Sequence, residues 1–109
     1  MVNLLETMKI NFPISGTRIF IPFKAVCSLS DMEFSGKIIV EYHPKSLVLE
    51  YADLENFINK ISKKKLTAED MVNFIFKEVE KSISPKYLKV LIDVEKTKAH
   101  KPVQVWRES

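Results

Sequence analysis

The feature that most constrains the fold is a change of hydrophobic period, from two residues to about 3.6 and back to two. Two stretches in the middle of the chain have the longer period, which is typical of half-buried helices. The first is marked by Leu54, Phe57, Ile58 and Ile61. The second is predicted to begin after Thr67, an N-cap with Asp70 three residues on, and to run to about Ser82. Its expected buried face consists of Met71, Val72, Phe74, Ile75, Val79 and Ile83.

Segments in which apolar and polar residues alternate flank this pair of helices on both sides. Before the helices we expect strands at residues 17–21 and 34–43, ended by Pro22 and Pro44 respectively. After the helices, residues 87–94 and 103–106 alternate again and predict two more strands. A short additional strand is favoured near the start, where Met8, Ile10 and Phe12 alternate with polar residues before Pro13.

Two helices between hairpins predict a single α+β domain, residues 1–109, with one antiparallel sheet and both helices on one face. Such a sheet has long edges, and pairing them with neighbouring subunits is one way in which proteins avoid aggregation. A half-sheet with two helices also offers no enclosed pocket of its own. We therefore expect a homo-oligomer with its sites at the subunit borders.

The composition limits the chemistry that the chain can perform. A single cysteine forms no internal disulfide, and with only two histidines it predicts no zinc site. Only two glycines are present, which excludes the glycine-rich loops that hold phosphates in nucleotide-binding proteins. No apolar run reaches the length of a membrane span, and the first residues lack the pattern of a signal peptide. These features predict a cytoplasmic protein that contacts no membrane.

The net charge of +3, with 17 Lys and Arg against 14 Asp and Glu, permits a polyanionic partner without requiring one. The lysines gather in two clusters, which are candidates for contacts with the phosphates of a partner such as RNA: Lys63, Lys64 and Lys65 in the middle of the chain, and Lys98 and Lys101 near its end. The alternative is that they form an ordinary solubilising surface.

Cys27 lies in a polar loop between two predicted strands, with Asp31 and Glu33 close behind it. A lone thiol in such a loop is either a nucleophile or a small buried apolar side chain. The two carboxylates could move protons beside a reactive sulfur, or they could be solvated loop residues. Spacing alone leaves both alternatives open.

Several short motifs follow Cys27 in a constant register. They are Tyr42-His43-Pro44, Leu49-Glu50, Ala68-Glu69-Asp70-Met71-Val72-Asn73 and Pro85-Lys86-Tyr87. With these motifs the chain resembles the 7-cyano-7-deazaguanine reductase family of queuosine biosynthesis and its archaeal amidinotransferase relatives. That family has the tunnelling fold, in which small subunits join their sheets edge to edge. The resemblance implies a ββααββ subunit in a ring or barrel, with stacked rings as a further option.

The chain departs from the reductase pattern at three places. The stretch tied to NADPH use is acidic here, at residues 51–56. The family's catalytic aspartate falls at Phe34, with Glu33 one position earlier, and its histidine falls at Ala68. The resemblance therefore points to the archaeal branch, which needs no cofactor. The expected enzyme uses ammonia to convert the nitrile of 7-cyano-7-deazaguanine in tRNA to the amidine of archaeosine.

The resemblance also implies roles for individual residues. Cys27 would form a thioimide with the nitrile, and Glu69 together with Glu50 would hold the deazaguanine. Glu33 or Asp31 would move protons. Two alternatives to this function remain open. One is an NADPH-dependent nitrile reductase that acts on the base itself, and the other is a non-catalytic protein that binds a purine, a pterin or RNA.

Overall fold

The computed structural model describes residues 5–109. Its elements follow one another in the order β1 (Thr7–Lys9), β2 (Thr17–Val26), β3 (Glu33–His43), β4 (Leu47–Leu49), α1 (Tyr51–Ser62), α2 (Ala68–Ile83), β5 (Tyr87–Thr97) and β6 (Val103–Glu108). The predicted α+β class and the ββααββ order are therefore confirmed, with β1 and β4 as additional short strands. No helix in the described part of the chain is long and apolar enough to cross a membrane. The expectation of no signal peptide concerns residues that partly lie outside residues 5–109.

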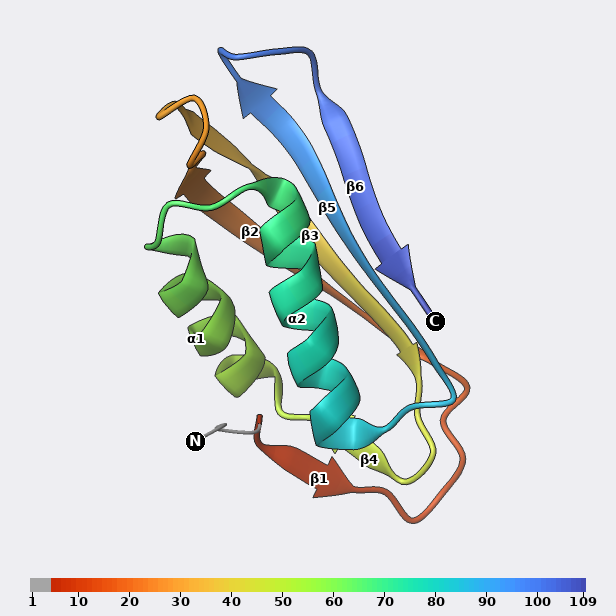
Figure 1. The fold of residues 1–109 in the computed structure, drawn as a ribbon. Coiled ribbons are helices and arrows are strands. Elements are labelled where there is room, and N and C mark those ends of the chain that lie inside the picture. The colour runs from red at the N-terminus through yellow and green to blue at the C-terminus, as the bar shows by residue number, and fades with distance from the viewer. Residues whose placement is uncertain (1–4) are drawn as a thin grey trace.

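The main sheet has four antiparallel strands in the order β2-β3-β5-β6. Both helices cover one face of it, as Figure 1 shows: α1 packs against β2, and α2 packs against β5 and β6. Strands β2 and β6 form the two edges of this sheet. The short strands β1 and β4 pair separately, close to the end of α2 where β5 begins.

The core lies between the sheet and the helices, where the sequence pattern predicted it. Ile38, Val40 and Tyr42 on β3 are fully buried, and Val40 and Ile38 stand opposite Val90 and Ile92 of β5. The buried Tyr42 hydroxyl accepts a hydrogen bond of 3.0 Å from the backbone N–H of Leu49. This bond joins the main sheet to β4.

Pro22 does not end a strand, contrary to the sequence prediction. It lies inside β2, which continues to Val26. Proline is tolerated in an edge strand such as β2, because there its nitrogen can face the open side of the sheet, where no hydrogen bond between strands is needed. Strand β2 is therefore long enough to carry the chain directly to Cys27.

Phe74 was predicted to be buried, and this is wrong: its side chain is 50% exposed. Phe76 is buried in its place, under the guanidinium group of Arg107 at 4.1 Å from the ring centre. Successive helical residues turn by about 100°, so Phe74 falls outside the arc that contains Met71 and Ile75. The buried face of α2 extends as far round the helix as Phe76, because α2 packs against both β5 and β6.

Candidate active site around Cys27

Cys27 is the first residue after β2 and begins the loop that leads into β3. Two backbone hydrogen bonds of 2.9 Å close this loop, one from Cys27 N–H to the Met32 carbonyl and one from Asp31 N–H to the Cys27 carbonyl. Asp31 has a φ of 62°, a left-handed conformation that aspartate adopts more readily than most residues. The tight turn keeps the thiol beside the backbone N–H groups of its own loop.

The loop makes the thiol of Cys27 more acidic. Hydrogen bonds from the backbone N–H groups of Ser30 and Leu29, and then from the Ser30 hydroxyl, lower the pKa of Cys27 below its ordinary value. Partial burial and the negative charge of Glu69 act in the opposite direction. The net effect favours the thiolate, which is the nucleophilic form of cysteine.

Cys27 and Glu69 line the same cavity, which has a volume of about 270 Å³. The cavity lies where the Cys27 loop meets the start of α2 and the hairpin between β5 and β6. Its walls are formed by Cys27, Leu29, Ser30, Phe34, Thr67, Ala68, Glu69, Val94, Thr97, Ala99, His100, Val103 and Val105. Its volume is near the lower end of those of ligand pockets, about 300 Å³. Residues of a single chain line this cavity, and its location at a subunit border stays a prediction.

Local hydrogen bonds explain why Glu69 lies beside Cys27. Thr67 caps α2 in a capping box, where its hydroxyl accepts from Asp70 N–H at 3.1 Å and Asp70 accepts from Thr67 N–H at 3.3 Å. The preceding residue, Leu66, donates its N–H to the carbonyl of Val26 at 3.1 Å. Because Val26 precedes Cys27, this bond ties the first turn of α2 to the cysteine loop.

Asp31 and Glu33 lie outside this cavity within the chain. Asp31 forms an ion pair of 2.6 Å with Lys65, so one candidate for proton transfer pairs with one candidate for phosphate binding. Glu33 forms an ion pair of 3.5 Å with Lys24. Both pairs are exposed, and such pairs contribute little to stability. Each carboxylate is thus paired with a lysine, and neither lines the cavity that contains Cys27.

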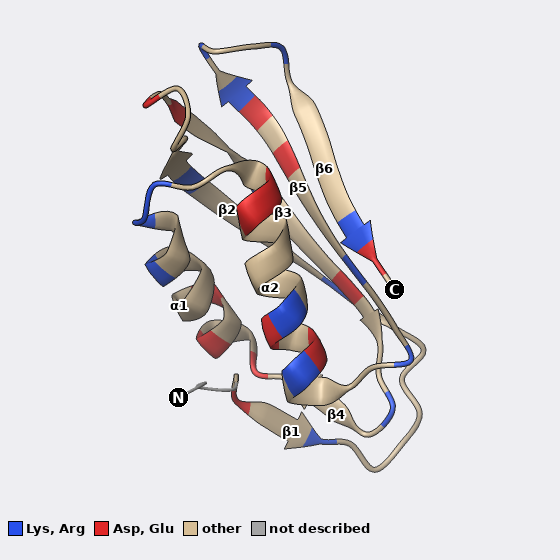
Figure 2. Cartoon of the chain, in the orientation of Figure 1, with Lys and Arg blue, Asp and Glu red and all other residues tan. Residues whose placement is uncertain are grey.

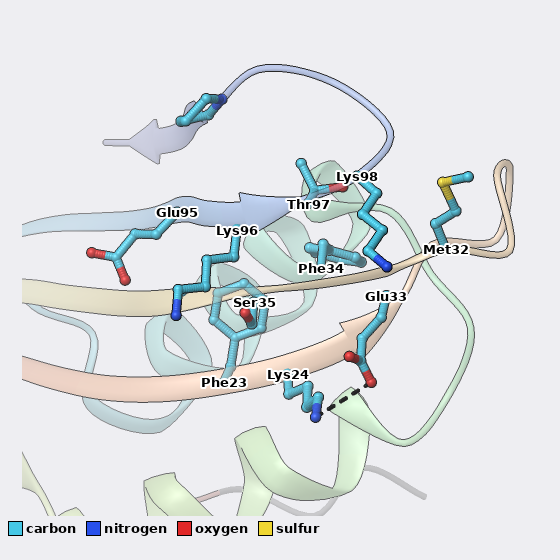
Figure 3. Close-up of a pocket in the computed structure, with 12 residues that line it drawn as sticks. Phe23, Lys24, Met32, Glu33, Phe34, Ser35, Glu95, Lys96, Thr97 and Lys98 are labelled. Atoms are coloured by element: carbon cyan, nitrogen blue, oxygen red, sulfur yellow. Dashed lines mark ion pairs between the residues drawn. The ribbon is translucent and has the colours of Figure 1, made fainter.

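Glu33 faces a different hollow, a groove of about 970 Å³ on the side of the sheet without helices (Figure 3). The ends of β2, β3 and β5 form this groove, and its charged residues are Lys24, Glu33, Glu95, Lys96 and Lys98. Phe34 lines both this groove and the cavity of Cys27. Phe34, at which the resemblance placed the family's aspartate, is thus a buried aromatic residue between the two hollows.

Glu50 is the N-cap of α1, where its carboxylate accepts a hydrogen bond of 2.6 Å from Asp53 N–H. The start of α1 lies at the opposite end of the helix layer from the Cys27 loop (Figure 1). Within one chain, Glu50 and Glu69 therefore do not line a common cavity. The helix cap accounts for the carboxylate of Glu50 without a ligand.

The two predicted lysine clusters lie at the same end of the molecule as the Cys27 loop (Figure 2). Lys63, Lys64 and Lys65 form the loop between α1 and α2, and Lys98 and Lys101 belong to the loop between β5 and β6. Their side chains are exposed. The cavity is therefore bordered by basic loops on two sides.

His100 also lines the cavity of Cys27, and no pattern in the sequence indicated this. It lies in the β5–β6 loop, and its position depends on how that hairpin folds back over α2. The other histidine, His43, stacks on Tyr87 with ring centres 4.9 Å apart. No group of three or more potential metal ligands is found among residues 5–109.

Comparison with solved structures identifies the class of fold. The chain superposes on the crystal structure of the archaeosine synthase QueF-Like in the apo form with a TM-score of 0.81. The match covers 90% of this chain and 96% of the other, at 22% sequence identity. A four-stranded antiparallel sheet with two helices on one face, matched in this way, has the tunnelling fold.

The sequence identifies the family within that fold. Residues 34–97 match the family model QueF, described as QueF-like protein, and the chain belongs to this family. Two curated relatives are named NADPH-dependent 7-cyano-7-deazaguanine reductase. The one from Wolinella succinogenes is 30% identical over 87 residues, which cover 80% of this chain and 64% of the relative. The one from Sulfurimonas denitrificans is 28% identical over 71 residues, which cover 65% of this chain and 57% of the relative. The chain thus spans about 60% of the length of these relatives.

Proposed function

We propose that this protein is a tRNA-modifying amidinotransferase that converts the nitrile of 7-cyano-7-deazaguanine in tRNA to the amidine of archaeosine. The observation that carries the proposal is the cavity in which an acidified thiol, Cys27, lies together with the carboxylate of Glu69. Membership of the QueF family supports a nitrile-bearing deazaguanine as the substrate, and the fold is that of an archaeosine synthase.

Cys27 acts as the nucleophile in this reaction. Its thiolate adds to the nitrile carbon while the nitrile nitrogen takes up a proton, which gives a covalent thioimide. Ammonia then adds to the same carbon and loses a proton, and the C–S bond breaks to release the amidine and the thiolate. No electrons are transferred, so the sequence of steps needs no reductant.

Glu69 anchors the base. The Watson–Crick edge of a guanine-like base presents two adjacent N–H donors, and a carboxylate offers two acceptor oxygens in matching geometry. With Cys27 in the same cavity, this grip directs the nitrile towards the sulfur. The structural alternative for Glu69, a favourable acid in the first turn of a helix, does not explain why it lines the same cavity as the thiol.

The tRNA and the neighbouring subunits contribute the remaining contacts. We propose that Lys63, Lys64, Lys98 and Lys101 contact phosphates of the tRNA, whereas Lys65 is engaged by Asp31. We further propose that the exposed edges of β2 and β6 pair with other copies of the chain in a ring or barrel. In such an assembly, Glu33, Asp31 and Glu50 would act at a site only from a neighbouring subunit.

A nitrile reductase is the second candidate, because both curated relatives carry that name. The electrostatics of α1 disfavour it. Glu50, Asp53 and Glu55 stand at the start of this helix, where the reductase pattern implies a serine- and lysine-rich stretch. Three carboxylates repel an anionic cofactor such as NADPH.

Product analysis separates the two reactions. The protein is incubated with tRNA that carries 7-cyano-7-deazaguanine and with ammonium, in the absence of any reductant, and the nucleosides are analysed by mass spectrometry. We expect conversion to the amidine that depends on ammonium. Oxidation of NADPH with the base alone as substrate, together with no amidine, would contradict the proposal and favour the reductase.

A further inference from the structure

We propose that His100 is the proton-transfer residue of the Cys27 cavity. The proposal rests on the function proposed above, because it assigns the acid and base of that reaction. The cavity joins a nucleophile, a carboxylate and an imidazole: Cys27, Glu69 and His100. Histidine is the side chain best suited to give and take protons near neutral pH.

The β5–β6 hairpin brings His100 to the cavity. Strand β5 ends at Thr97, and β6 begins at Val103, so the loop between them is short. The Thr97 hydroxyl accepts a hydrogen bond of 3.1 Å from Ala99 N–H, which turns the chain immediately before the histidine. Thr97, Ala99 and Val103 also line the cavity, so this segment forms one of its walls.

A hydrogen bond determines which ring nitrogen of His100 carries the proton. Nδ1 lies 2.6 Å from the carbonyl oxygen of Lys101. A carbonyl oxygen only accepts, so Nδ1 is the donor, and Nε2 of the neutral ring bears the lone pair. Protonation of Nε2 leaves the Nδ1 bond intact. The ring can therefore switch between base and acid without losing the contact that orients it.

The other titratable groups near the sulfur have different tasks. Asp31 and Glu33 are held by Lys65 and Lys24, outside the cavity. Position 68 is an alanine, whose side chain has no group that can donate or accept a proton. Glu69 is required in its ionised form if it accepts two hydrogen bonds from the base. Among the residues that line the cavity in the described part of the chain, His100 is thus the group available to transfer protons.

One histidine can donate and take up the protons that the reaction transfers. The imidazolium donates its Nε2 proton to the nitrile nitrogen as the bond between sulfur and carbon forms. The neutral ring then takes a proton from the nitrogen of the attacking ammonia as the new C–N bond forms. The C–S bond breaks and returns the thiolate. Nitrile and ammonia have become an amidine, and Cys27 and His100 have regained their initial states.

Replacement of His100 by glutamine tests the proposal by turnover. We expect kcat to fall about 10²-fold, the usual contribution of general acid–base catalysis, with little change in KM. The pH dependence contributed by the imidazole should vanish, and added imidazole should partly restore the rate of His100→Ala. His43→Gln is the matched control, because His43 stacks on Tyr87 away from the cavity, and it should retain the wild-type profile.

The reactivity of the thiol gives a second readout that needs no turnover. An imidazolium near Cys27 favours the thiolate, so iodoacetamide should alkylate the wild type faster than His100→Gln in mildly acidic buffer. The charged or titratable groups that share this environment are Cys27 and Glu69, which line the same cavity, and Lys98 and Lys101, which belong to the same loop as His100. If His100→Gln has the wild-type alkylation profile, the proposal for His100 is overturned. If alkylation differs but no amidine forms even in the wild type, the proposed function fails instead.

Discussion

Replacement of Gly36 by alanine is expected to cause a loss of stability of about 3–5 kcal/mol, well above that of a typical substitution. Strands β3 and β5 shift register between Ser35 and Gly36, and the two backbones approach closely at this point. A Cβ atom on residue 36 would overlap the carbonyl oxygen of Asp93 and would lie 2.9 Å from the backbone nitrogen of Glu95. Because these are backbone atoms of a central strand, they cannot move aside without breaking the sheet.

Urea denaturation of Gly36→Ala measures the effect, and Gly16→Ala is the control. A Cβ at residue 16 would meet the side chain of His43 at 3.1 Å and the carbonyl oxygen of Tyr42 at 3.4 Å. The exposed imidazole can rotate away, so a change within about 1 kcal/mol is expected there. A wild-type midpoint for Gly36→Ala would mean that β3 and β5 lie further apart at the bulge than the structure has them.

Replacement of Glu69 by glutamine is expected to weaken binding of the nitrile-bearing base about 10²-fold or more. The amide keeps one acceptor and replaces the other with a donor that opposes an N–H of the base, and each hydrogen bond to a charged group contributes about 1.5–3 kcal/mol. The same substitution should make Cys27 more reactive, because the negative charge of Glu69 raises the pKa of the thiol. Weaker binding together with a more acidic thiol is the expected signature.

The pH dependence of alkylation by iodoacetamide measures the thiol, and Ser30→Ala is the matched control. The Ser30 hydroxyl lowers the pKa of Cys27, so its removal should raise that pKa and move the alkylation curve to higher pH. Glu69→Gln should move the curve to lower pH. Shifts in the same direction for both variants, or unchanged binding in Glu69→Gln, would refute the roles assigned to these side chains.

The fold could be predicted because it depends on patterns that are local in the sequence. The alternation of Ile38, Val40 and Tyr42 and the cap at Thr67 are both observed. The two wrong predictions, for Pro22 and Phe74, concern features that depend on which elements lie next to a strand or helix in the fold. Pro22 is accommodated only because β2 lies at an edge, and the exposure of Phe74 depends on the position of α2 over two strands.

The site was predictable only through the family resemblance, which placed Cys27 and Glu69 together. The capping box is a local pattern that determines where α2 begins, but the bond from Leu66 to Val26 joins segments far apart in the sequence, and no periodicity reveals it. The ion pair of Asp31 with Lys65 joins residues that are far apart in the chain, and no periodicity reveals it. The place of His100 likewise follows from the path of the β5–β6 hairpin.

The most direct test of the central claim is the intact mass of the protein after incubation with 7-cyano-7-deazaguanine in the absence of ammonium. The claim is that Cys27 attacks a nitrile on a base held in its own cavity. The wild type should gain the full mass of the base through the thioimide, whereas Cys27→Ala should gain nothing. An unmodified wild type, or an adduct that persists in Cys27→Ala, would contradict the claim.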